Sequence, residues 1–277
     1  MELKNQVNGL YTTGVSVGYR DRPVLDGIDV EIPGSAVTTI IGPNGCGKST
    51  LLKTFLRLLR PTTGHILLDG TDITRFSTRE LARRMGLLPQ SPTAPEGLRL
   101  RDLVALGRHP HHSWLNSWTP SDDAAVDHAM ELTHTSELAD HPIDSLSGGQ
   151  RQRAWIAMTL AQETDLVLFD EPTTYLDLRH CIEVLDLIDT LCADHGRTVV
   201  MVLHDLALAC RYSDHLIIMK EGRIAATGHP RDIISTDILR EVFGLEAAII
   251  RDPVSDRPLI IPIGKRRTCT SDRTVAP

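Results

Sequence analysis

Short apolar runs alternate with longer amphipathic stretches along most of this chain of 277 residues. The runs at 36–41, 166–169 and 199–203 are continuous and bounded by polar residues, which is typical of strands buried on both faces of a parallel sheet. Apolar spacing over 178–192, and over the STLLKTFLRLL stretch that follows the first run, predicts helices. The pattern therefore predicts an α/β fold around a central, mostly parallel sheet.

A helical insertion is expected between residues 90 and 160. The β-branched runs disappear in this stretch, and apolar spacing typical of helices replaces them. The helix-like segments lie at about 100–108, 121–138 and 150–161. We therefore expect 11–89 and 161–245 to form the sheet core, with 90–160 inserted into it as a helical subdomain.

Further β-structure is expected near both ends of the chain. Strand-like pieces at 15–19, 27–32 and 65–68 favour an antiparallel β-layer beside the core. Two apolar runs flank a turn-rich centre and predict a C-terminal hairpin over 246–264. The basic and polar segment 265–277 is expected to be a flexible tail. A single domain spanning 11–264 accounts for all of these elements except the tail.

Composition and charge exclude several classes of protein. Hydrophobic residues make up 41% of the chain and charged residues 23%, so it should fold as a globular domain. The net charge of −7 lacks the Lys/Arg excess of a nucleic-acid surface, so we expect no nucleic-acid partner. No apolar run approaches the roughly 20 residues that span a bilayer. Residues 1–14 lack a signal-peptide pattern, which favours a cytoplasmic location. The five cysteines lack a Cys-x-x-Cys spacing, which favours reduced thiols over disulfides or a zinc site.

A glycine-rich loop follows the first buried run and matches the pattern G-x-x-x-x-G-K-[ST] in full. The loop comprises Gly42, Pro43, Asn44, Gly45, Cys46, Gly47, Lys48 and Ser49. Its glycines let backbone N–H groups converge on phosphates, Lys48 adds a charge, and Ser49 offers a hydroxyl to Mg²⁺. Thr50 adds a hydroxyl near the α-phosphate. An ordinary glycine-rich turn is the alternative, but the position between strand and helix favours a phosphate cradle.

Two acids, Asp170 and Glu171, follow the second buried run directly. The carboxyl ends of parallel strands gather at one edge of a sheet, so Asp170 can reach the Mg²⁺ shell and Glu171 the attacking water. An isolated acid pair would more simply be a solvated strand end. The phosphate loop makes hydrolysis the favoured interpretation.

An LSGGQ sequence at 146–150 completes an ordered set of motifs. The set consists of the loop at 42–49, Gln90, LSGGQ, Asp170 with Glu171, Asp177 and His204. With this set in this order, the chain resembles the ATP-binding subunits of ABC transporters over nearly its whole length. The resemblance implies a P-loop NTPase core and an ATPase that uses ATP and Mg²⁺.

The resemblance also implies roles that spacing alone does not. The signature loop would bind the γ-phosphate of an ATP held by a second copy of the chain; it comprises Ser147, Gly148, Gly149 and Gln150. Asp177 would line the seam between the copies. Gln90 would contact Mg²⁺ and water, and His204 would sense the γ-phosphate. Tyr19 would stack on the adenine, with core packing as its alternative.

Several segments look most like the importer ATPases for iron–siderophore, haem and cobalamin complexes. These are GRHPH at 107–111, the run 150–158 and EPTTYLD at 171–177, while 202–206 and 251–262 are most similar to ATPases for catecholate siderophores. A metal site at His109, His111 and His112 is not favoured, because further acids or cysteines at ligand spacing are missing.

This resemblance implies a subunit that powers iron–siderophore uptake. Catecholate siderophores are the first expected cargo, and hydroxamate siderophores are the next. Its partners would be a second copy of itself, two integral-membrane permease subunits and, indirectly, an extracytoplasmic substrate-binding protein. It would lie peripherally on the cytoplasmic face of the membrane, with the segment 90–115 lining the groove where a permease docks. Haem or cobalamin import, or a soluble ABC-type ATPase of iron–sulfur cluster assembly, remain the alternatives.

Overall fold

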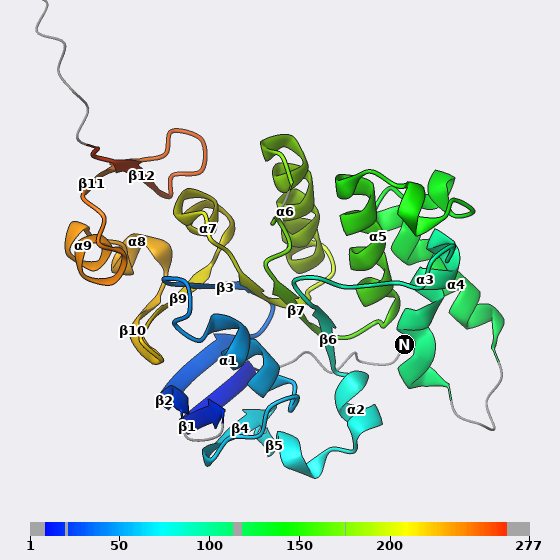
Figure 1. Ribbon diagram of the computed structural model, residues 1–277, viewed down its shortest axis with the longest axis horizontal. Helices are drawn as coiled ribbons and strands as arrows, with labels where there is room; N and C mark the ends of the chain where they lie inside the picture. Colours follow the sequence, from blue (N-terminus) through cyan, green and yellow to red (C-terminus); the bar gives the residue numbers. More distant parts are fainter. Residues whose placement is uncertain (1–8, 20–21, 113–117, 175, 265–277) are drawn as a thin grey trace, which may run out of the picture.

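The computed structural model describes residues 9–19, 22–112, 118–174 and 176–264, and a six-stranded sheet lies at its centre (Figure 1). In spatial order its strands are β10 (Arg223–Gly228), β9 (His215–Lys220), β3 (Val37–Ile41), β8 (Thr198–Val202), β7 (Leu166–Asp170) and β6 (Met85–Leu88). Neighbouring strands are parallel except for the pair β10–β9. The mostly parallel sheet predicted from the sequence is confirmed.

Both faces of this sheet are covered, which explains why its strands read as continuous apolar runs. Alternate side chains of β7 belong to two separate cores. Leu166 and Leu168 pack with helix α1 (Lys48–Phe55) and the antiparallel layer. Val167 and Phe169 pack with α5 (Gly148–Ala161) and α6 (Leu178–Ala193) on the other face.

The antiparallel layer is a separate four-stranded sheet, as predicted. Its spatial order is β2 (Arg22–Pro33), β1 (Gly9–Tyr19), β4 (Thr63–Leu68) and β5 (Thr71–Asp72). The turn η1 (Ile73–Arg75) and helix α2 (Thr78–Ala82) lead from it back to β6. Both long strands extend well beyond the predicted pieces at 15–19 and 27–32.

Helices gather at one end of the sheet, between β6 and β7 in the sequence. In Figure 1, α3 (Leu100–Ala105), α4 (Pro120–Leu132) and α5 lie together on the right. They are joined by the turns η2 (Leu106–His111), η3 (Ser136–Leu138) and η4 (Ile143–Ser145). This confirms the inserted helical subdomain in the predicted fold class.

Two of the predicted helices differ from the observed ones. The helix expected over 121–138 ends at Leu132, because His134 adopts a left-handed φ of 52°, which breaks the helical hydrogen-bonding pattern. The helix expected over 100–108 tightens into a 3-10 turn after Ala105, where Pro110 cannot donate a backbone hydrogen bond.

The C-terminal part adds α7 (Leu206–Tyr212), α8 (Pro230–Ile233), α9 (Thr236–Phe243) and a hairpin of β11 (Ala247–Arg251) and β12 (Pro258–Pro262). The hairpin was predicted. Strands β6, β9 and β10 were not predicted. None of the helices in the described ranges is both long enough and apolar enough to span a bilayer.

Candidate functional site

The loop between β3 and α1 is held in a tight curve by main-chain contacts. Cys46 N donates to Pro43 O at 3.3 Å, and Gly222 N, from the turn between β9 and β10, donates to Cys46 O at 3.1 Å. A Cβ atom at Gly42 would lie 2.3 Å from Met219 O, so only glycine fits there. The Cys46 side chain is buried, and burial raises the pKa of its thiol.

Lys48 is the first residue of α1 and is buried against the loop. Its Nζ donates to Gly42 O at 2.8 Å and to Pro43 O at 3.0 Å. The helix follows Gly47, whose φ of 107° reverses the chain so that α1 starts at the loop. A helix N-terminus and an ammonium group together attract an anion, which is the arrangement a phosphate chain requires.

Ser49 and Asp170 join α1 to the carboxyl end of β7. Ser49 Oγ donates to Asp170 Oδ1 at 2.9 Å. Burial raises the pKa of Asp170, the Ser49 hydrogen bond opposes that rise, and the charge of Glu171 adds to it. A divalent cation beside the carboxylate would favour its ionised form. Hydroxyl and carboxylate oxygens are the ligands that Mg²⁺ prefers, so this pair fits a magnesium site.

Glu171 is fixed by three side chains from different segments. Its Oε2 accepts hydrogen bonds from Gln90 Nε2 at 2.6 Å and Thr174 Oγ1 at 3.0 Å. Its Oε1 lies 2.6 Å from His204 Nε2, at the end of β8. Its φ of 58° is a conformation that non-glycine residues seldom adopt. The structure thus brings the predicted residues Gln90, Glu171 and His204 together. Thr174 was not predicted, and its only signal in the sequence is its position three residues after Glu171.

The signature loop is built as a helix N-terminus. Ser147 Oγ accepts from Gln150 N at 3.3 Å, and Gln150 Oε1 accepts from Ser147 N at 3.0 Å, which is a capping box at the start of α5. Gly148 is exposed and Gly149 is buried. Among the hydrogen bonds of the described residues, none joins this loop to the phosphate loop. One copy of the chain therefore does not unite the two motifs by such a contact.

Asp177 begins α6 next to the signature loop. Its Oδ1 accepts from His180 N at 2.9 Å and from His180 Nδ1 at 2.7 Å, and these hydrogen bonds lower the pKa of Asp177. The His180 ring covers Gly149, where an added Cβ would lie 2.5 Å from His180 Cδ2. Sequence reasoning did not single out His180. Its only sequence signal is its position three residues after a helix-capping aspartate.

The two remaining predicted residues contribute less to this picture. Thr50 lies in the first turn of α1, where its carbonyl accepts from Thr54 Oγ1 at 2.6 Å. Tyr19 ends β1, but its side chain falls outside the part of the structure that is described. Adenine stacking by Tyr19 therefore stays a prediction.

The GRHPH segment is anchored by a buried ion pair. Arg108 Nε donates to Asp122 Oδ1 at 2.9 Å, and both side chains are almost fully buried. Thr119 Oγ1 donates to Asp122 Oδ2 at 2.6 Å, and Arg108 Nη1 donates to Glu163 Oε2 at 2.7 Å. Burial would raise the pKa of Asp122, but hydrogen bonds from Thr119 and Arg108 outweigh it and lower the pKa to about 2.

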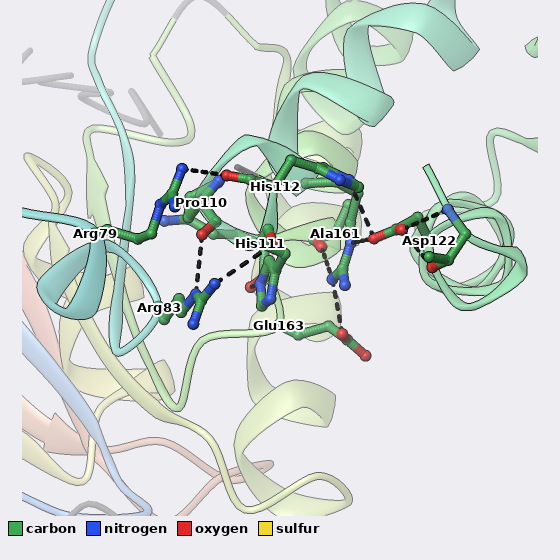
Figure 2. Close-up of polar contacts among 11 residues, drawn as sticks. Arg79, Arg83, Pro110, His111, His112, Asp122, Ala161 and Glu163 are labelled. Atoms are coloured by element: carbon green, nitrogen blue, oxygen red, sulfur yellow. Dashed lines mark hydrogen bonds and ion pairs between the residues drawn. The ribbon is translucent and has the colours of Figure 1, made fainter. Parts of the chain in front are cut away.

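Two arginines reach this segment from the sheet side (Figure 2). Arg83, just after α2, donates from Nε to Pro110 O at 2.9 Å, and Arg79 donates to His112 O. The neighbouring histidines face different partners, since His111 Nε2 lies 2.9 Å from Gln162 O. In the part of the chain that the structure describes, no three His, Cys, Asp or Glu side chains are grouped as metal ligands.

Comparisons with known proteins agree on one family. The ABC transporter family matches residues 25–174. An ATP-binding protein of Bacillus subtilis (strain 168) that is assigned to a siderophore transport system is 49% identical over 94% of this chain and 95% of its own. The ferric enterobactin transport ATP-binding protein of Escherichia coli (strain K12) is 48% identical over 93% of this chain and 95% of its own.

A solved structure gives the same answer for the fold. An inward-facing metal-chelate type ABC transporter has a chain that is 26% identical and superposes with a TM-score of 0.81. The superposition covers 93% of the chain described here and 98% of that chain. The likeness therefore extends over nearly the whole chain.

Proposed function

Because this chain belongs to the ABC transporter family, we propose that it is the ATP-hydrolysing subunit of an importer that takes up an iron–siderophore complex. One observation carries the ATPase part of this proposal. The Ser49–Asp170 pair lies at the start of α1, and the adjacent Glu171 carboxylate is held by three side chains. We take the whole span 11–264 as one nucleotide-binding domain, with 90–160 as its helical subdomain.

The proposed hydrolysis divides the work among these residues. Lys48 and the first turn of α1 bind the β- and γ-phosphates. Ser49, Asp170 and Gln90 would hold Mg²⁺, which supplies positive charge to the phosphate oxygens when it is bound. Glu171 orients the attacking water and accepts its proton.

His204 lies 2.6 Å from the same carboxylate, so it can hold Glu171 in place and contact the γ-phosphate. Tyr19 would complete the nucleotide site by stacking on the adenine.

A second copy of the chain is needed because the phosphate loop and the signature loop do not contact each other through a hydrogen bond within one described copy. The exposed signature loop, Ser147 and Gly148 with the N-terminus of α5, would meet the ATP held on the phosphate loop of the other copy. Asp177, whose side chain is 68% exposed, would lie at the seam between them. Closure of this pair on ATP would be the step that drives transport.

The membrane partners would be two permease subunits on the cytoplasmic face of the membrane. The predicted segment 90–115 is described up to residue 112, and 113–115 lie outside the described residues. The described part connects the sheet to the helical subdomain, and the Arg108–Asp122 ion pair holds it near its end. We propose this segment as the permease docking region. The substrate-binding protein outside the membrane would be reached only through the permeases.

The cargo assignment rests on the relatives named for siderophore and ferric enterobactin transport. The test is to delete the gene in iron-starved cells and measure uptake of radioiron carried by a catecholate, a hydroxamate, haem and, in parallel, labelled cobalamin. We expect loss of catecholate-bound iron uptake, restored by the wild-type gene and not by Glu171→Gln. Loss confined to haem or cobalamin would change the cargo, and intact uptake with defective iron–sulfur enzymes would favour cluster assembly.

A further inference from the structure

His180 connects two parts of the surface that would face a second copy. Its Nδ1 lies 2.7 Å from Asp177 Oδ1, and its ring lies against Gly149, the buried glycine of the signature loop. These two neighbours are 28 positions apart in the sequence, on different helices. His180 itself is only partly exposed, with a side-chain exposure of 34%.

The chemistry of Asp177 determines how the ring is held. Hydrogen bonds from the backbone and the ring of His180 lower the pKa of Asp177, so its carboxylate is ionised and can only accept. Nδ1 must therefore carry the proton. Both donors go to Oδ1, which fixes the rotamer of Asp177 and leaves Oδ2 for a contact outside the chain.

The His180 ring also lies so close to Gly149 that no side chain would fit at that position. An added Cβ would lie 2.5 Å from Cδ2 and 2.9 Å from Cγ of His180, so the ring is in contact with the backbone of the first turn of α5. Any shift of the ring would therefore affect both the Asp177 carboxylate and the backbone at Gly149.

Two further contacts connect α5 to α6 and to the loop that precedes α6. Gln152 Nε2 donates to Pro172 O at 2.8 Å, and Arg153 Nη1 lies 3.5 Å from Glu183 Oε2. The Arg153–Glu183 contact joins α5 to α6, and the Gln152 hydrogen bond joins α5 to the loop that precedes α6, so neither depends on His180. Removing the imidazole should therefore disturb the positions of Asp177 and Gly149 without unfolding the helices around them.

We propose that His180 is a positioning residue of the composite ATP site: it holds Asp177 and the signature loop in one fixed arrangement, so that a second copy meets both at once. This inference rests on the proposed function. It assigns to His180 a role in pairing and turnover, and none in binding ATP to its own copy's phosphate loop.

The test uses the full chain in the Glu171→Gln background with Mg-ATP, where pairing can be measured without hydrolysis. We expect His180→Ala to weaken the dimer about tenfold by sedimentation or light scattering, equivalent to about 1.4 kcal/mol of pairing free energy. His180→Asn, whose amide N–H can replace Nδ1–H, should recover to within about threefold of the parent. His195→Ala, which removes an exposed imidazole just beyond the far end of α6, is the matched control and should pair like the parent.

A second measurement separates positioning from general damage. With wild-type Glu171, His180→Ala should lower kcat about tenfold while the KM for ATP and the binding of a fluorescent ATP analogue stay within about twofold. Pairing and kcat equal to the parent's would overturn the inference, as would an Asn variant no better than Ala or a matching loss of ATP binding. A parent that binds no Mg-ATP would instead contradict the proposed function itself.

Discussion

Glu171 combines an unusual backbone conformation with a fully engaged carboxylate. Replacing it by Gln keeps the size of the side chain and removes its ability to accept a proton. We expect Glu171→Gln to bind ATP within about twofold of wild type and to lose roughly 100-fold or more in kcat, the usual range for a lost general base. Steady-state ATPase assays and fluorescent-ATP titrations measure the two effects separately.

Lys48→Ala provides the contrast, since it removes the charge that faces the phosphates. ATP binding itself should weaken by about tenfold or more, equivalent to about 1.4 kcal/mol. Undiminished turnover in Glu171→Gln would remove Glu171 from its proposed role. Unchanged ATP affinity in Lys48→Ala would argue against the phosphate cradle.

The same residues show what a sequence can and cannot reveal about a site. The phosphate loop is contiguous, so its pattern alone located it. Gln90 and His204 were found only through the resemblance, because folding brings them to Glu171 from distant segments. The contact between His180 and Gly149 depends on how two helices pack, and no local pattern encodes that packing.

Among the helices, α4 depends on the buried carboxylate of Asp122. Asp122→Asn removes the buried carboxylate from Arg108, leaves the more exposed Glu163 as its charged partner, and weakens the capping box with Thr119. Leaving a buried charge uncompensated costs about 3–5 kcal/mol, and because Glu163 still neutralises Arg108 we expect a loss of unfolding free energy below that range but above about 1 kcal/mol. Asp127→Asn on the same helix removes only an exposed partner of Arg101 and should cost less than about 1 kcal/mol. Urea denaturation measures both.

The pH dependence of this contribution has a defined direction. The folded pKa of Asp122 is about 2, below its usual value. The stabilisation by the ionised carboxylate is therefore present above the unfolded pKa of about 3.9 and is lost as the pH falls toward about 2. The stability difference between wild type and Asp122→Asn should shrink over that window. A difference that stays constant from pH 5 to pH 2 would contradict the role of the charge.

Element boundaries were harder to predict than element types. The end of α4 depends on the left-handed backbone of His134, and because this residue is not a glycine the sequence carries no stop signal there. Strand β10 has alternating burial and lies at the edge of the sheet, so it lacks the continuous apolar signal of β7 and β8. Strand β9 does carry such a run, at 216–219, but it was not singled out as a strand. The central strands gave that signal because both faces are covered.

At the scale of the whole molecule, a composite site predicts pairing that depends on ATP. In the Glu171→Gln background, Mg-ATP should shift the chain from monomer to dimer. Adding Ser147→Arg places a large charged side chain at the exposed signature loop and should abolish that shift. Ser121→Arg, at an exposed position on α4, is the control. The same light-scattering mass in every variant, with and without nucleotide, would count against the composite site.

The burial of Cys46 gives the nucleotide site a chemical property of its own. A thiol reacts with alkylating agents as the thiolate, and both the raised pKa of Cys46 and its enclosure within the loop keep that form scarce at neutral pH. N-ethylmaleimide should therefore inactivate the native ATPase slowly, although the cysteine lies among the phosphate-binding residues. Mild urea that opens the loop should make inactivation fast. A thiol at the centre of the site would thus be inert for as long as the loop keeps its shape.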